Sequence, residues 1–174
     1  KKYDLYVIED TAQAIGADYT FSNGEKKKVG TIGTIGCTSF FPSKNLGCFG
    51  DGGAIMTNDD ALAEKMKMIA NHGMKVRYHH EILGVNSRLD SIQAAILNVK
   101  LKHLEEYQKA RYDAAQIYTN GLKDIESIET PVEMSYSTHV YHQYTLKIKD
   151  GTRDELKAYL HDWNIPAMIY YPIP

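Results

Sequence analysis

An apolar run near the start of the chain, at residues 5–8, ends in two carboxylates, Glu9 and Asp10. A short apolar run of this kind is typical of a strand buried inside a sheet, here with polar groups at its carboxyl end. Such a strand needs neighbours on both sides, and few residues precede it. We therefore expect an α/β fold whose sheet continues beyond residues 1–174, so that the chain is a segment of a longer protein.

Two more strands and a helix are predicted between residues 36 and 72. The strands occupy residues 36–41 and 54–57, and a cluster of glycines lies between them. The helix begins after a cap at Asn58 and ends near residue 72. This order of elements is typical of a mixed sheet that helices cover.

The pattern changes in the second half of the chain. A long amphipathic helix is predicted from about Asp90 to Gly121, and it is longer than helices in globular domains usually are. We therefore expect a bend within it or a role in joining two domains. Residues 140–149 then alternate between apolar and polar, as in a half-exposed strand, and residues 152–163 form a further helix.

These patterns place a domain boundary near residue 122. Residues 1–122 are expected to form part of a large domain, and residues 123–174 the start of a smaller α/β domain. The length of 174 residues suits one domain with part of another.

Charge and cysteine content disfavour several classes of protein. With 20 basic and 22 acidic residues the formal net charge is −2, which argues against binding to nucleic acid through bulk charge. No apolar run reaches the roughly 18 residues that would suggest a membrane span. The two cysteines, Cys37 and Cys48, are too few for a disulfide framework, so we expect a reducing, cytoplasmic location.

One lysine lies where chemistry is expected. Lys44 follows Phe40 and Phe41 and precedes the glycine cluster, whose flexible backbone allows close approach to a ligand. A lysine amine in a partly desolvated pocket becomes a nucleophile toward carbonyl groups. Both a nucleophilic lysine and a solvated loop lysine fit this stretch.

Asp10 favours the nucleophilic interpretation of Lys44. It follows a strand, and open α/β sheets bind their ligands at the carboxyl ends of strands. A pyridine aldehyde bound to a lysine needs an acidic partner for its ring nitrogen, so that the ring can act as an electron sink. The alternative is that Asp10 only caps the helical turn that follows it.

Four blocks of the sequence together resemble the sugar-nucleotide aminotransferases of the DegT type. The blocks read EDTAQAIGA at 9–17, SFFPSKNLG at 39–47, GDGGA at 50–54 and NSRLD at 86–90. Enzymes of this family have fold type I and use pyridoxal 5′-phosphate. The resemblance implies that the chain covers the C-terminal part of the large mixed-sheet domain and the start of the small domain.

The resemblance also implies roles for five residues. Lys44 would form the Schiff base with the cofactor, Asp10 would contact the pyridine nitrogen, and Gln13 would lie beside the ring. Ser39 would hold the cofactor phosphate. Asn86 would reach the phosphate of the cofactor in the other subunit of a homodimer.

The activity implied by the resemblance is transfer of an amino group, from glutamate, to a nucleotide-linked keto sugar, in polysaccharide biosynthesis. Neither nucleic acid nor a membrane is an expected partner. Dehydratases of the family carry a histidine where Lys44 stands, so amino transfer is favoured over dehydration. A non-catalytic or regulatory member stays open as an alternative. No metal is expected, because the spacing of His72, His79 and His80 fits no zinc signature.

Overall fold

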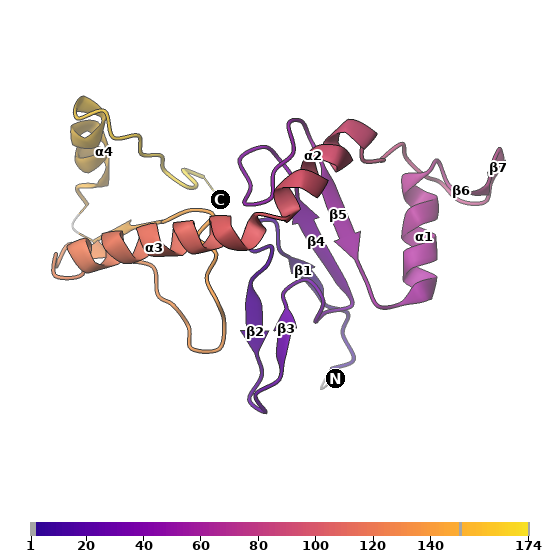
Figure 1. Ribbon diagram of the computed structural model, residues 1–174, viewed down its shortest axis with the longest axis horizontal. Coiled ribbons are helices and arrows are strands. Elements are labelled where there is room, and N and C mark those ends of the chain that lie inside the picture. Colours follow the sequence, from indigo (N-terminus) through magenta and orange to yellow (C-terminus); the bar gives the residue numbers. More distant parts are fainter. Residues whose placement is uncertain (1–2, 150, 174) are drawn as a thin grey trace.

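A three-stranded mixed sheet lies at the centre of the computed structural model, which describes residues 3–149 and 151–173 (Figure 1). Its order is β1 (Ile8–Asp10), β4 (Ile35–Ser39), β5 (Gly53–Met56). β1 runs parallel to β4, with Asp10 opposite Cys37, and β5 runs antiparallel to β4. Together with the helices around it, this mixed sheet confirms the predicted α/β class.

The first strand differs from the predicted one in position and in burial. It begins at Ile8 rather than at residue 5, and Tyr6 is 87% exposed. Within the described residues, β1 pairs with β4 alone, so its other edge is open. Because no strand covers this edge within the described residues, the apolar side chains of residues 5–8 stay exposed.

Helix α1 (Asp60–Ala70) is capped one residue later than predicted. The carboxylate of Asp59, rather than the amide of Asn58, accepts a hydrogen bond from the backbone N–H of Leu62 over 3.0 Å. The remaining strands form antiparallel pairs: β2 (Asp18–Thr20) with β3 (Lys26–Lys28), β6 (Met74–Val76) with β7 (His79–His80), and β8 (Ile128–Glu129) with β9 (Lys147–Ile148).

The predicted long helix is divided in two, which confirms the expected bend. α2 (Ser91–Leu101) and α3 (Leu104–Leu122) are separated by Lys102 and His103. α3 leads away from the sheet toward α4 (Arg153–Asp162), which lies at the far end of the molecule (Figure 1). The junction of α2 and α3 packs on the loop after β4, where the buried core consists of Leu46, Cys48, Leu97 and Leu104.

The sequence predicts a strand over residues 140–149, but only β9, at Lys147–Ile148, is a strand in the structure, so the prediction is wrong for the other described residues of this range. Val140 and Tyr141 are only 6% and 4% exposed, and Tyr141 has φ +43°, which is incompatible with a strand. The guanidinium of Arg111 on α3 donates a hydrogen bond to the carbonyl of Tyr141 over 3.2 Å. The backbone here therefore bonds to a side chain in place of a neighbouring strand.

Candidate functional site

A cavity of about 600 Å³ opens beside the carboxyl end of β1. Three of the residues singled out in the sequence line it: Asp10, Gln13 and Lys44. Its size is typical of a site for a small molecule. The other lining residues come from the turn after β1, from the segment after β8 and from the C-terminal part of the chain: Ala12, Ala14, Ala17, Thr138, His139, Val140 and Tyr171.

Asp10 is the last residue of β1, and its carboxylate is held by the chain that follows. Its Oδ1 accepts a hydrogen bond from the backbone N–H of Ala12 over 3.0 Å. The capping role considered as an alternative is therefore present. Because a carboxylate has two acceptor oxygens, this bond orients the group and leaves it capacity to bind a ligand.

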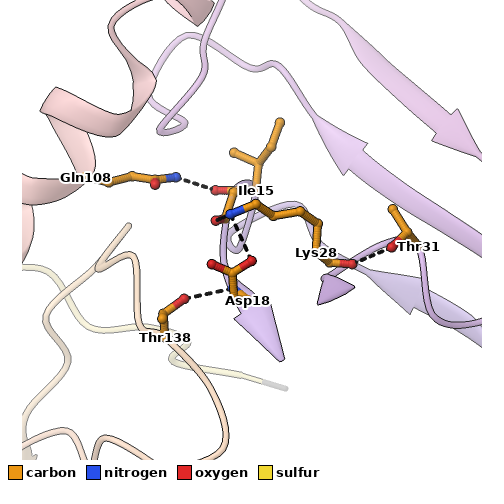
Figure 2. A network of polar contacts seen from close by, with 7 residues as sticks. Ile15, Asp18, Lys28, Thr31, Gln108 and Thr138 are labelled. Carbon is orange, nitrogen blue, oxygen red and sulfur yellow. Dashed lines mark hydrogen bonds and ion pairs between the residues drawn. The ribbon is translucent and has the colours of Figure 1, made fainter. Parts of the chain in front are cut away.

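The turn that carries Gln13 is fixed from two sides (Figure 2). From α3, the side-chain amide of Gln108 donates a hydrogen bond to the carbonyl of Ile15 over 2.8 Å. From the hairpin of β2 and β3, the ammonium of Lys28 donates a hydrogen bond to the carbonyl of Gly16 over 3.0 Å and also pairs with Asp18, with 2.9 Å between Nζ and Oδ1. These contacts hold the wall of the cavity on which Gln13 lies.

Lys44 is half-buried in the loop between β4 and β5, and α2 holds this loop in place. The side-chain oxygen of Gln93 accepts hydrogen bonds from two backbone N–H groups of the loop, the first from Phe49 over 2.8 Å. The ammonium of Lys100 donates to the carbonyl of Gly47 over 2.6 Å. The position of Lys44 thus depends on a helix almost fifty residues further along the chain.

Thr138 and His139 form a wall of the cavity that the sequence analysis did not predict. The hydroxyl of Thr138 accepts a hydrogen bond from the backbone N–H of Asp18 over 2.8 Å, as Figure 2 shows. His139 is exposed and lines the cavity. No motif marks either residue, because tertiary contacts alone bring this segment to the site.

The positive charge of Lys44 affects the pKa of a nearby histidine, His142. Burial lowers the pKa of His142, and the positive charges of Lys44 and Arg111 lower it further. Its Nδ1 is buried and, within the described part of the chain, has no hydrogen-bond partner. His142 is therefore held in its neutral form beside the lysine.

The other two predicted residues lie outside this cavity. Ser39 ends β4, and its hydroxyl accepts a hydrogen bond from the backbone N–H of Phe41 over 3.2 Å. Asn86 is exposed and lines a second cavity, of about 460 Å³, where its side-chain oxygen accepts a hydrogen bond from Arg88 over 3.0 Å. The structure thus brings together Asp10, Gln13 and Lys44 at one cavity, and Ser39 and Asn86 do not line it.

Within residues 3–149 and 151–173, no group of three or more histidine, cysteine, aspartate or glutamate side chains is placed to hold a metal ion. None of the helices in this described part is both long and apolar enough to cross a membrane.

The fold and the cavity together define an α/β protein with a lysine-lined cavity at the carboxyl end of a strand. Over residues 1–174 the chain matches the DegT/DnrJ/EryC1/StrS aminotransferase family, and it belongs to this family. The match confirms the resemblance found in the four sequence blocks.

Individual relatives share both sequence and fold. The chain is 51% identical to a "Pleiotropic regulatory protein" of Geobacillus stearothermophilus, over 100% of this chain and 45% of that protein. It is 47% identical to the UDP-2-acetamido-2-deoxy-3-oxo-D-glucuronate aminotransferase of Pseudomonas aeruginosa, over 99% of this chain and 46% of that protein. The crystal structure of Streptomyces venezuelae DesV in complex with a ketimine intermediate superimposes with a TM-score of 0.91 at 40% identity, covering 99% of this chain and 45% of that one. The chain thus spans about half the length of the relatives it matches.

Proposed function

We propose that the chain is the lysine-bearing part of an aminotransferase that uses pyridoxal 5′-phosphate and transfers an amino group, from glutamate, to a nucleotide-linked keto sugar. The observation that carries this proposal is the shared cavity of Lys44, Asp10 and Gln13. An amine, a carboxylate and an amide in a space of about 600 Å³ fit the cofactor's aldehyde, ring nitrogen and ring oxygen.

Each residue has a task that follows from its chemistry. When bound, pyridoxal 5′-phosphate supplies an electron sink for the negative charge that develops when a proton leaves the donor's α-carbon. Lys44 would hold the cofactor covalently through its amine. When the amino donor displaces Lys44, the freed amine would take the proton from the donor's α-carbon and deliver it to a carbon of the cofactor. Asp10 keeps the pyridine nitrogen protonated, because its carboxylate favours a positive charge beside it. Gln13 lies beside the ring.

Ser39 and Asn86 have the roles of phosphate ligands in this proposal, Ser39 in its own subunit and Asn86 across a homodimer. The separation of Asn86 from the lysine cavity supports a role in a second site. Residues 1–122 then belong to the large domain and residues 123–174 to the small one.

The substrate and the setting are inferred from the relatives and from the thiols. The names of relatives, such as the Pseudomonas aeruginosa enzyme, support a nucleotide-linked 3-keto sugar as the acceptor. Polysaccharide biosynthesis is the setting that we propose for the reaction. Cys37 and Cys48 are free thiols, which supports a cytoplasmic location. The single S–H of Cys48 is shared between the carbonyls of Phe40 and Gly50, which both lie within hydrogen-bond distance of its sulfur.

A regulatory role is the second candidate, because a relative 51% identical over the whole chain carries a regulatory name. A dehydratase is disfavoured, because Lys44 is a lysine and not a histidine. Turnover distinguishes the candidates: an aminotransferase converts glutamate to its keto acid, and a purely regulatory protein does not.

The test is covalent labelling of the full-length protein. After incubation with pyridoxal 5′-phosphate, borohydride is expected to fix the label on Lys44, and Lys44→Ala is expected to abolish both the label and turnover. Lys65→Ala, on the exposed surface of α1, is the control and should keep both. A label at another lysine, or turnover by Lys44→Ala, would overturn the proposal.

A further inference from the structure

One ring nitrogen of His139 is already hydrogen-bonded to the backbone. Its Nδ1 accepts a hydrogen bond from the backbone N–H of Tyr141 over 3.0 Å. A nitrogen that accepts such a bond carries no hydrogen, so the neutral imidazole must carry its hydrogen on Nε2. The described residues provide no hydrogen-bond acceptor for Nε2. The ring therefore has a donor available on the side away from its own backbone.

The orientation of the ring is fixed by stacking. The rings of His139 and Tyr141 lie with 4.1 Å between centroids and 29° between planes. Tyr141 is immobilised in turn, because its hydroxyl donates a hydrogen bond to Glu133 over 2.5 Å and Gln116 donates to the same carboxylate oxygen over 2.8 Å. A rigid aromatic support of this kind holds a ligand-binding side chain in one geometry.

The backbone on each side of His139 is also held. Thr138 before it exchanges hydrogen bonds with the backbone of Asp18, and the carbonyl of Val140 after it accepts one from the side chain of Asn45 over 2.8 Å. Asn45 is the neighbour of Lys44. The position of His139 is thus tied directly to the loop that carries the lysine.

The charge of His139 decides what it can bind. Although His139 is exposed at the cavity, the part of its side chain that is desolvated lowers its pKa, and this effect outweighs the carboxylate of Glu133, which raises it. The ring is therefore neutral at neutral pH and donates through Nε2 without a positive charge. A neutral donor suits a hydroxyl or carbonyl oxygen, whereas a carboxylate is bound more strongly by a guanidinium.

The cavity lining favours the same ligand. Among the described residues that line it, Lys44 is the one cation, and no arginine is present. Tyr171 adds an aromatic side chain with a hydroxyl. We propose that His139 is a substrate-binding residue that donates a hydrogen bond from Nε2 to an uncharged oxygen of the sugar, an assignment that rests on the function proposed above.

Two variants of His139 distinguish the role of Nδ1, which accepts from the backbone, from that of Nε2, which is proposed to donate to the substrate. His139→Asn places an amide oxygen where Nδ1 lies, so the bond from Tyr141 is kept and the distal donor is lost. His139→Gln extends an amide N–H toward the position of Nε2. A purely structural role predicts that asparagine is the better replacement, and the proposed role predicts that glutamine is.

Binding is measured by calorimetry on the full-length protein after cofactor reduction with borohydride, which prevents turnover. The probes are UDP- and dTDP-linked 3-amino sugars, with UDP and dTDP alone as controls. We expect His139→Asn to weaken sugar binding about tenfold and His139→Gln to weaken it less than about threefold, in line with the loss of one hydrogen bond. Binding of UDP and dTDP alone should not change.

Several results would overturn the assignment. Sugar binding that is unchanged in His139→Asn contradicts it, and so does an equal loss in the binding of UDP alone. A loss confined to the glutamate half-reaction would identify the donor carboxylate as the ligand, and a loss of affinity for pyridoxal 5′-phosphate would identify the cofactor.

A second measurement needs neither cofactor nor turnover. Nitrogen NMR of the full-length protein at neutral pH should show the ring of His139 with its hydrogen on Nε2, and a hydrogen on Nδ1 would contradict the proposal. The proposed function fails separately, when borohydride fixes no label on Lys44, whereas the position of the hydrogen on the His139 ring is measured without any cofactor.

Discussion

The buried side-chain amide of Asn45 donates a hydrogen bond to the carbonyl oxygen of Val140 over 2.8 Å, although 95 positions separate the two residues. Each is the neighbour of a residue that lines the cavity, Lys44 in the first case and His139 in the second. This bond therefore sets the spacing between the lysine loop and the segment after β8. Because both groups are buried, breaking it leaves a polar atom without a partner, which is costly.

Asp10→Asn is expected to keep the cofactor and to lose most of the rate. The amide oxygen of asparagine can still accept the hydrogen bond from the N–H of Ala12, so the turn after β1 is preserved. An amide carries no negative charge, so it does not stabilise a protonated ring nitrogen. Turnover should fall by about 10²–10³ or more, the loss seen when one strong electrostatic partner is removed. Steady-state kinetics and cofactor absorbance measure the two effects; wild-type turnover would mean that Asp10 serves only as a cap.

Asn86 is expected to act across a homodimer, and mixing two inactive variants tests this. A Lys44→Ala chain paired with an Asn86→Ala chain gives one site with both residues intact and one with both removed. After subunit exchange about half of the dimers are mixed, so activity should recover to about a quarter of the wild-type value.

The complementation experiment requires that Asn86→Ala is severely impaired on its own and that exchange is shown with differently tagged chains. Ser87→Ala, at the neighbouring exposed position, is the matched control and should keep its activity. If exchange occurs without recovery, Asn86 does not act in the partner's site. A monomer in light scattering would also contradict the prediction.

Gly16→Ala is expected to destabilise the protein more than Gly24→Ala. The two glycines have almost the same left-handed φ, +83° and +84°, so alanine costs about 1–2 kcal/mol at either one. At Gly16 the added Cβ would also overlap the side-chain amide of Gln108, whereas it meets nothing within 4 Å at Gly24. Displacing Gln108 adds about 1–3 kcal/mol. Urea unfolding of the full-length variants measures the difference, and equal losses would show that Gln108 does not constrain this turn.

Glu9 is expected to make stability depend on pH. Its carboxylate accepts hydrogen bonds from the backbone N–H groups of Gly30, Ile32 and Gly33 at 2.8, 2.8 and 2.6 Å. Partial burial raises the pKa of Glu9, but these N–H groups outweigh it and hold the pKa below the ordinary value of 4.5. Folding therefore favours the ionised form. The stabilisation is present above that ordinary value and is lost as the pH falls through the lower pKa of the folded state.

Glu9→Gln should consequently lower the free energy of unfolding at neutral pH more than Glu126→Gln, an exposed control. The gap between the two variants should shrink on acidification to about pH 3, where Glu9 is protonated in the unfolded chain. Urea unfolding at both pH values measures this gap. A gap that does not change with pH would show that the charge of Glu9 does not matter.

The parts of the site that sequence predicted are those fixed by local structure. Asp10 follows an apolar run, and Lys44 lies between a strand ended by Pro42 and a glycine cluster, so each position can be inferred from its neighbours. The mixed sheet and the bend in the long helix followed from the same patterns. The location of the bend did not, because neither Lys102 nor His103 is a residue that usually breaks a helix.

The segment around His139 could not be predicted from its sequence. Its alternating pattern favours a strand, but the side chains of Asn45 and Arg111 take up the carbonyls of Val140 and Tyr141 that a neighbouring strand would use. These partners lie far away in the chain. A pattern confined to ten residues carries no information about them, and tertiary contacts override it.

The helices α2 and α3 meet at a joint, and each of them holds a different wall of the cavity. α2 holds the lysine loop through Gln93 and Lys100, while α3 holds the facing turn and segment through Gln108 and Arg111. A rotation of one helix against the other at this joint would widen or narrow the cavity, although the identity of every lining residue stays the same. Substitutions at Lys102 and His103 are therefore a route to a cavity that accepts larger or smaller ligands while its lining residues stay the same, which makes this joint a target for directed evolution.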